Sequence, residues 1–199
     1  MRSRVTIVGQ YVWYDINMAL IYITGPAGSG KSALQKELQL RGYEAYDEDA
    51  PEIGSAHNVI TNVAVSIPPA DIRDEDWFTN HEWRVRDTAM KKMHAKSVSQ
   101  NVYFFGNSLK ESEIRSFVDK IIYLDLDTAT MRKRIANRTD NDYGKNDDEF
   151  SRILERQKDA AGFISNFEHQ TIDAAESIEQ VVAKIIRSTP TMDSQRARN

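Results

Sequence analysis

Short apolar runs alternate along this chain with segments of helical periodicity. Between the apolar runs, nonpolar residues recur every three or four positions, which predicts helices over about 31–41, 128–138 and 177–187. Strands that alternate with helices are typical of a parallel sheet covered by helices on both faces, an α/β fold. The five runs that we interpret as strands are residues 20–24, 44–46, 102–105, 120–124 and 171–173.

The segments outside this alternation have weaker patterns. Residues 50–76 contain four Pro or Gly residues and look irregular, although 57–67 includes possible extended pieces. Thr79 to Glu82 has the spacing of a capping box, which predicts a helix from there to about Ser97. We expect residues 1–17 to be a poorly ordered extension, 18–187 to be one domain, and 188–199 to be a fraying tail.

The first strand leads directly into the complete phosphate-binding loop (P-loop) pattern Gly-x-x-x-x-Gly-Lys-Ser. Its glycines allow successive backbone N–H groups to point at phosphate oxygens, and the helix that follows adds its positive N-terminal end. Lys31 can neutralise the phosphates and the Ser32 hydroxyl can bind Mg²⁺. The residues predicted to bind the nucleotide here are Gly25, Pro26, Ala27, Gly28, Ser29, Gly30, Lys31, Ser32 and Ala33.

The order of these features resembles the nucleoside and nucleotide kinase group of P-loop proteins, which includes adenylate, shikimate and gluconate kinases. Three features carry this resemblance: the P-loop lies near the start of the domain, the second strand ends in acidic residues, and an Arg-rich helix follows the fourth strand. Small bacterial kinase-like ATP-binding proteins look most similar. The resemblance implies a three-layer α/β/α P-loop NTPase fold, a five-stranded parallel sheet of order 2-3-1-4-5, and a lid at about 134–146.

The Arg-rich helix offers cations for a transferring phosphoryl group. Arg134 and Arg138 are four residues apart, so they share one helix face and can converge on a phosphate. The kinases of the resembled group close a lid arginine over this group, which implies a catalytic role for Arg138 first, Arg134 second and Arg132 behind them. A solvated basic face is the alternative interpretation.

Two aspartates follow the second strand. If the segment is extended, Asp47 and Asp49 point the same way and Glu48 faces away. The resemblance to shikimate kinases implies that Asp47 assists Mg²⁺ and helps to bind the acceptor. It also implies that Asp49 binds the acceptor hydroxyl or acts as its base. The third strand, by contrast, ends at Gly106 without the acid that many P-loop ATPases place there.

An aromatic and cationic cluster lies where the resembled kinases bind their acceptor. Trp83 and Arg84 are the predicted acceptor-binding residues, with Trp77, His81 and Arg86 around them. Core packing of the two tryptophans is an equally good interpretation.

Composition narrows the function classes. The charge of −4 and pI near 5.6 argue against a nucleic-acid binder, and the chain has no cysteine, which excludes disulfides and thiolate chemistry. No apolar segment reaches the length of a membrane span. We therefore expect a cytoplasmic protein, monomer or homodimer, with a small-molecule acceptor as partner and no contact with nucleic acid or membrane.

These observations favour an ATP-dependent kinase that uses Mg²⁺ and phosphorylates a small hydroxylated or phosphorylated acceptor, of nucleoside, nucleotide, sugar or polyol type. The missing acid of the third strand and the long irregular segment 50–76 motivate an alternative, an ATP-binding regulatory or interaction protein without turnover. A toxin-like kinase acting on a nucleotide sugar is a further alternative.

Overall fold

Five parallel strands form the central sheet of the computed structural model, in the order β4-β8-β3-β9-β10. Counted along the chain within this sheet, that order is 2-3-1-4-5, so the predicted fold and strand order are confirmed. The structure describes residues 3–7, 10–14, 18–68, 75–139 and 144–189. The strands are β3 (Leu20–Thr24), β4 (Glu44–Asp47), β8 (Val102–Phe105), β9 (Lys120–Asp125) and β10 (Gln170–Asp173).

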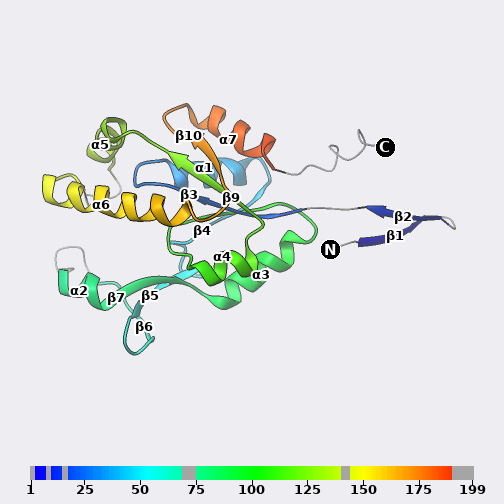
Figure 1. Ribbon diagram of the computed structural model, residues 1–199, viewed down its shortest axis with the longest axis horizontal. Helices are drawn as coiled ribbons and strands as arrows, with labels where there is room; N and C mark the ends of the chain where they lie inside the picture. The colour runs from blue at the N-terminus through cyan, green and yellow to red at the C-terminus, as the bar shows by residue number, and fades with distance from the viewer. Residues whose placement is uncertain (1–2, 8–9, 15–17, 69–74, 140–143, 190–199) are drawn as a thin grey trace.

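Helices cover both faces of this sheet because its strands are apolar on both sides. In β3, Ile21 and Ile23 join one hydrophobic cluster, whereas Leu20 and Tyr22 join the other. The first cluster includes residues of α1 (Lys31–Leu40), α5 (Thr128–Asn137), α6 (Asp147–Ile164) and α7 (Ile178–Arg187). The second includes residues of α3 (Asp87–Ser97) and α4 (Glu111–Phe117). Figure 1 shows α7 above the sheet and α3 and α4 below it.

The final helix starts as the sequence predicts. Ser177 and Gln180 form a capping box, in which each side chain bonds to the backbone of the other residue. Val181, Val182 and Ile185 form the buried face of α7. The range of the predicted lid, about 134–146, includes the end of α5 and the connection to α6, and its residues 140–143 lie outside the described part of the chain.

A second, antiparallel sheet corrects two expectations about the middle of the chain. The segment 50–76, expected to be irregular with possible extended pieces at 57–67, contains β5 (Gly54–Asn58) and β6 (Ala64–Val65), so only its irregular part is corrected. The capping box at Thr79 does not start a helix, because α2 (Glu75–Asn80) ends there and β7 (His81–Val85) follows. The reason is tertiary: β7 pairs with β5, about 25 residues earlier, and this pairing outweighs a local cap signal.

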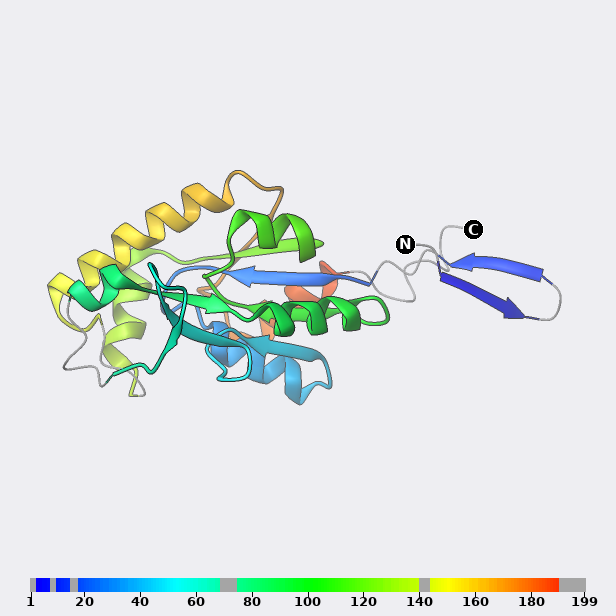
Figure 2. The ribbon, with the colours of Figure 1, turned by 90° about the horizontal axis from the view of Figure 1, so that it is seen from below.

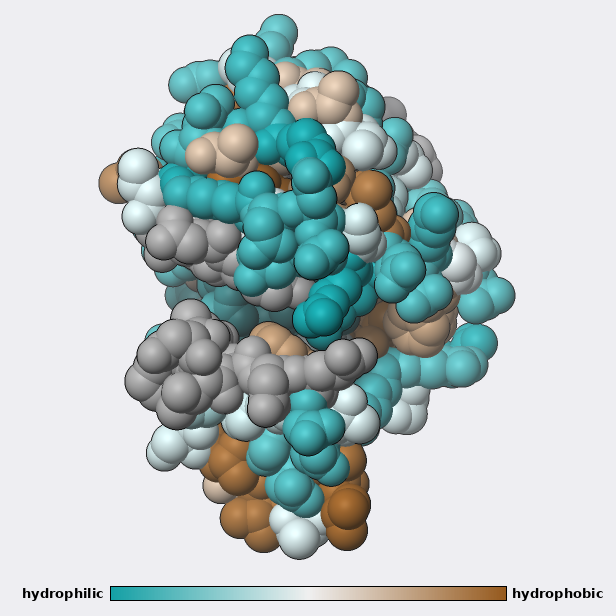
Figure 3. Space-filling model, turned by 90° about the vertical axis from the view of Figure 1, so that its left-hand side faces the viewer, coloured by the Kyte–Doolittle hydropathy of each residue, from teal (hydrophilic) through white to brown (hydrophobic). Residues whose placement is uncertain are grey.

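The tip of this small sheet exposes apolar side chains. Val59, Ile60 and Val63 are exposed in the turn between β5 and β6. In Figure 3 they account for brown atoms at the lower end of the molecule, where Figure 1 places β6.

The start of β3 and the end of α7 lie on the same side of the domain (Figure 2), where Ala19, Ser188 and Thr189 line one pocket. Strands β1 (Ser3–Ile7) and β2 (Gln10–Tyr14) pair with each other as an antiparallel hairpin outside the central sheet. At the other end, the first residues after α7 are packed, since the Thr189 hydroxyl bonds to the buried Tyr103 hydroxyl at 2.9 Å. Within the described ranges, none of the helices is long and apolar enough to cross a membrane.

Candidate nucleotide and acceptor site

The P-loop connects β3 to α1 with a backbone that only glycine adopts easily. Gly28 and Gly30 have φ values of 77° and 89°, in the left-handed region. Gly25 lies so close to the end of β9 that a Cβ there would overlap the Leu124 carbonyl. The loop thus turns tightly at the carboxyl end of the sheet, where ligands of open α/β sheets bind.

Lys31 folds back over this loop. Its Nζ donates hydrogen bonds to the carbonyl oxygens of Gly25 at 2.6 Å and Pro26 at 3.0 Å. Burial lowers its pKa to about 8, and the negative charges of Glu48, Asp47 and Asp49 oppose this decrease. The lysine therefore lies among three carboxylates, in a place where a bound phosphate would compete for its charge.

The loop and the start of α1 offer hydrogen-bond donors to an anion. The first N–H groups of α1 have no partner within the helix, as in every helix N-terminus. Ser29 is 2 % exposed, and its buried hydroxyl has no hydrogen-bond partner among the residues that the structure describes. An unsatisfied buried hydroxyl beside free amides fits a polyphosphate well.

Ser32 and Asp47, the predicted magnesium residues, lie in direct contact. The Ser32 hydroxyl donates to Asp47 Oδ2 at 2.9 Å, which joins the start of α1 to the end of β4. Within the parts of the chain that the structure describes, no cluster of three or more acidic or histidine side chains offers a complete metal site. A magnesium ion here would therefore use few protein ligands together with phosphate oxygens, which is the usual mode for Mg²⁺.

Asp49 lies next to this pair, although the predicted geometry was wrong. The segment is not extended: β4 ends at Asp47, and a turn follows in which the Asp49 amide donates to Asp47 Oδ1 at 3.0 Å. Desolvation raises the pKa of Asp49, and the charge of Asp47 raises it further. Both carboxylates nevertheless influence Lys31, so the turn keeps them at the P-loop.

The sequence argument missed Glu48, which it only expected to face away. Its carboxylate is buried and accepts hydrogen bonds from the amides of Asn107 at 2.7 Å and Ser108 at 3.0 Å, and from the Ser108 hydroxyl at 2.7 Å. Desolvation raises its pKa. A Cβ at Gly106 would overlap this carboxylate. The end of β8, which has no acid of its own, thus receives one from the neighbouring strand.

Asn107 is a second residue that the sequence argument did not assign. The orientation of its amide that satisfies most partners donates to Thr24 Oγ1 at 2.7 Å and to the Gly25 carbonyl at 3.0 Å. Its oxygen then accepts from Lys31 Nζ at 3.3 Å. The only sequence signal was its position just after an apolar strand, where polar residues of parallel sheets often meet.

Of the lid arginines, Arg134 contacts the P-loop directly. Its guanidinium donates to the Gly28 carbonyl at 3.2 Å and to the Ala175 carbonyl at 3.4 Å. Arg138 ends α5, and its amide bonds to the Arg134 carbonyl at 3.1 Å, so the two stay one turn apart. Arg132 instead pairs with Asp147 at 2.7 Å and stacks on Phe150, on the side of α6.

A cavity of about 510 Å³ is lined by Asp49, by residues of α2 and the small sheet, and by Arg156 of α6. Trp83 lines it, and its indole N–H donates to the Glu48 carbonyl at 3.1 Å. The residues that give the cavity its chemistry are Asp49, Trp77, Phe78, His81, Trp83 and Arg156.

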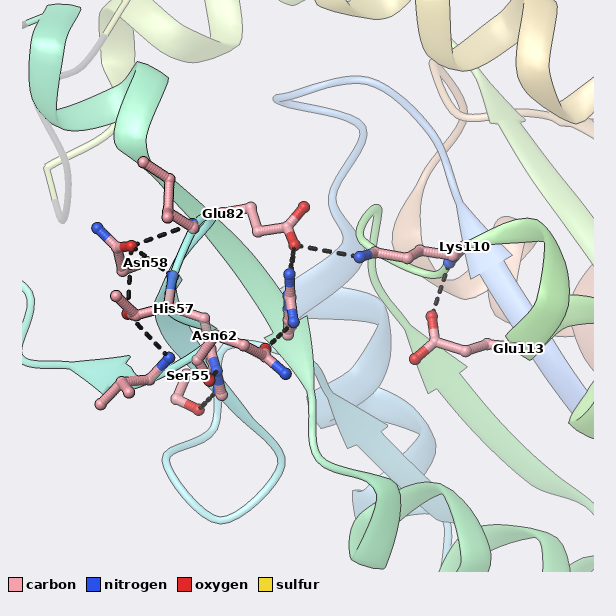
Figure 4. A network of polar contacts seen from close by, with 11 residues as sticks. Ser55, His57, Asn58, Asn62, Glu82, Lys110 and Glu113 are labelled. Atoms are coloured by element: carbon pink, nitrogen blue, oxygen red, sulfur yellow. Dashed lines mark hydrogen bonds and ion pairs between the residues drawn. The ribbon is translucent and has the colours of Figure 1, made fainter.

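Arg84 is not among the residues that line this cavity. It contacts Glu82 and Asn62, and Glu82 also pairs with Lys110 at 3.1 Å. Figure 4 shows this group of polar contacts between β7, the β5–β6 turn and the start of α4. The cavity therefore brings Trp83 together with Asp49, whereas Arg84 connects elements of the scaffold.

Comparisons with known proteins identify the family and the fold of this chain. The model of the AAA domain family matches residues 21–155, more than half of the chain. No curated protein sequence gives a significant match.

Among solved structures, shikimate kinase from Acinetobacter baumannii in complex with shikimate has a TM-score of 0.53 at 15 % identity, over 85 % of this chain and 92 % of that one. Shikimate kinase from Bacteroides thetaiotaomicron has a TM-score of 0.53 at 17 % identity, over 85 % of this chain and 97 % of that one. A gluconokinase from Sinorhizobium meliloti 1021 has a TM-score of 0.48 at 17 % identity, over 86 % and 91 %. The two shikimate kinases show the fold that the sequence resemblance implied.

Proposed function

Because the chain belongs to the AAA domain family, we propose that it is an ATP-dependent kinase that transfers the γ-phosphoryl group to a hydroxyl of a small acceptor. One observation carries this proposal. Lys31, Ser32, Asp47 and Asp49 meet at the carboxyl end of the sheet, and a cavity of acceptor size begins at Asp49. ATP is the expected nucleotide on the sequence resemblance.

The P-loop binds the phosphates in this proposal. The P-loop backbone and the N-terminal end of α1 hold the β- and γ-phosphates, and Lys31 exchanges its two carbonyl partners for phosphate oxygens. Arg134, already bonded to the loop, neutralises charge on the transferring group together with Arg138.

Ser32 and Asp47 would hold a magnesium ion between them and the phosphates, in place of their present mutual hydrogen bond. When bound, the ion supplies positive charge at the phosphate oxygens and orients them. Asp49 accepts the hydrogen bond of the acceptor hydroxyl and takes its proton late in the transfer. Its raised pKa fits this role, since a stronger base accepts a proton more readily.

The alternative of a protein without turnover was motivated by the lack of an acid at the end of the third strand of the sheet and by the irregular segment 50–76. The Glu48 carboxylate lies at that strand end, and β5 and β6 form within that segment, so neither observation favours the alternative over a kinase. No observation favours a nucleotide-sugar acceptor over a smaller one.

The test is acceptor-stimulated release of ADP from ATP and Mg²⁺, with nucleosides, nucleotides, sugars and polyols as acceptors. Lys31→Ala should lower turnover about 10²- to 10³-fold, because a charge that stabilises the transferring group is lost. Lys36→Ala is the matched control, an exposed lysine on the same helix, and should leave turnover unchanged. Full activity of the Lys31→Ala variant, or no binding of ATP or GTP by the wild type, would contradict the proposal.

A further inference from the structure

The walls of the cavity beside Asp49 are largely aromatic. Trp77 and His81 are stacked, with ring centroids 4.8 Å apart and planes inclined by 20°. The Phe78 and Trp77 rings are nearly perpendicular, with their centroids 5.2 Å apart. Ala56 and Ile67 add apolar surface to the lining. The volume of about 510 Å³ lies within the range of about 300–1,000 Å³ that is usual for small-molecule sites.

These rings are held in place before any ligand binds. The His81 ring bonds through Nδ1 to the Trp77 carbonyl at 2.8 Å, which fixes it against the Trp77 indole. The Trp83 indole is anchored by its bond to the Glu48 carbonyl at 3.1 Å. Gly54 leaves room for that indole, since a Cβ there would overlap it. A preformed flat apolar surface favours a ligand with a planar ring, because stacking then costs little reorganisation.

Few polar groups line the cavity, and they lie around the rings. Arg156 of α6 lies 5.4 Å from the centre of the Phe78 ring and offers guanidinium donors. The Glu82 carboxylate is engaged by Lys110 and Arg84. A polyol or sugar acid needs a hydrogen-bond partner for each hydroxyl that it buries, and leaving several unpaired is costly. The lining therefore suits a ring with a few edge heteroatoms better than a polyol.

The negative charges of Asp49 and Asp47 determine which group of the acceptor is suited to react. Asp49 lies beside Asp47, so an acceptor that reacts through a phosphate oxygen would bring a third negative charge to these two carboxylates. An uncharged hydroxyl avoids this repulsion and can donate its hydrogen bond to Asp49. The nucleophile is accordingly an alcohol and not a phosphate.

We propose that the acceptor is a nucleoside, whose base stacks in the aromatic cavity formed by Trp77, His81 and Trp83 while a sugar hydroxyl reaches Asp49. This inference rests on the proposed kinase function and narrows it. In the step, the hydroxyl oxygen forms a bond to the γ-phosphorus and the bond from that phosphorus to the bridging oxygen breaks. ADP leaves with the electron pair, and the hydroxyl proton goes to the Asp49 carboxylate.

Binding and turnover are measured separately to test this. Calorimetry on the full chain with adenosine, guanosine, cytidine and thymidine, and with ribose, glycerol and gluconate, should show binding of at least one nucleoside and weaker or no binding of the others. Trp77→Leu should weaken the binding of that nucleoside about tenfold or more, because an aromatic face on which the base stacks is lost. Trp77→Phe keeps an aromatic face and should restore most of the affinity.

Arginines on α6 provide a matched pair of variants. Arg156→Gln should weaken nucleoside binding, since it removes the guanidinium from the cavity. Arg152→Gln changes an exposed arginine one turn earlier, which does not line the cavity, and should have no effect.

The outcomes separate the two proposals. Nucleoside binding that depends on Trp77 but gives no ADP supports the cavity assignment and contradicts the kinase function. Turnover with a polyol, unaffected by Trp77→Leu, supports the kinase function and overturns the nucleoside assignment. Phosphorylation of a nucleoside monophosphate on its phosphate would contradict the transfer to a hydroxyl in both proposals. No nucleoside binding at millimolar concentration, with or without an ATP analogue, also overturns it.

Discussion

At the level of single residues, Lys31 is the charge on which the nucleotide site depends most directly. Burial lowers its pKa to about 8, while Glu48, Asp47 and Asp49 favour its charged form. In the structure its Nζ is bonded to neutral oxygens, namely the carbonyls of Gly25 and Pro26 and the amide oxygen of Asn107. A phosphate would be the first anion in direct contact with it, so nucleotide binding should be coupled to its protonation.

This coupling predicts a pH dependence of ATP affinity. Below about pH 8 the Lys31 ammonium is charged and attracts the phosphates, whereas above that pH the free protein must take up a proton to bind. Affinity should therefore fall as the pH rises through 8, by up to about tenfold per unit. Calorimetric titration with ATP between pH 7 and 9.5 measures this change in affinity.

The control for this prediction is Lys31→Arg. A guanidinium stays charged throughout this range, so the variant should bind ATP with a flatter pH profile, even if its affinity is lower. A wild-type profile that is flat up to pH 9.5 would show that Lys31 is not the titrating group.

At the level of elements, the ends of β4 and β8 are connected through Glu48. Its amide continues the ladder by donating to the Phe105 carbonyl at 2.9 Å, and its carboxylate accepts bonds from Asn107 and Ser108. Because Asn107 also contacts Thr24 of β3, this one carboxylate helps to position the ends of three neighbouring strands. Gly106 has no side chain that would block it.

Replacement of Glu48 should therefore destabilise the domain. Each carboxylate oxygen of Glu48 accepts from a different backbone amide, Oε1 from Asn107 and Oε2 from Ser108. Glu48→Gln keeps the shape but replaces one of these oxygens by an NH₂ group, so one of the two amides loses its acceptor. We expect a loss of about 1–3 kcal/mol in the free energy of unfolding, measured by urea denaturation. Glu52→Gln, at an exposed glutamate four residues later, should change it by less than about 0.5 kcal/mol. Equal stability of both variants would contradict the role assigned to Glu48.

At the level of the whole molecule, the two ends of the chain contribute differently to the fold. Strands β1 and β2 form a sheet of their own, whereas Ser188 and Thr189 contact the domain. The Thr189 hydroxyl bonds to that of Tyr103, and Lys120 donates to the Ser188 carbonyl.

Deletions should reveal this difference. Removal of residues 1–17 should leave the midpoint of thermal unfolding unchanged, since the central sheet loses no strand. Removal of residues 188–199 should lower it, because the buried Tyr103 hydroxyl loses its partner, at a cost of about 1–3 kcal/mol. Scanning calorimetry compares the two. The assignment of both ends fails if the first deletion is the more damaging one.

The sequence by itself determined the parts of this protein that depend on neighbouring residues. The apolar runs and helical spacings located all five strands of the central sheet, and the P-loop pattern placed Lys31 and Ser32 at the end of the first. Ser177 correctly marked the start of α7. Such signals are local: a strand, a glycine turn and a helix cap each follow from a few adjacent side chains.

Only the tertiary structure decided which distant residues meet. The pairing of β5 with β7 replaced a predicted helix start at Thr79, and it produced the cavity that joins Trp83 to Asp49. No role for Glu48 was evident in the sequence, where it lies between two aspartates, yet its carboxylate lies at the end of β8. These contacts connect residues about 25 to 60 positions apart. Their energies come from burial and from the satisfaction of buried polar groups, which no short stretch of sequence expresses.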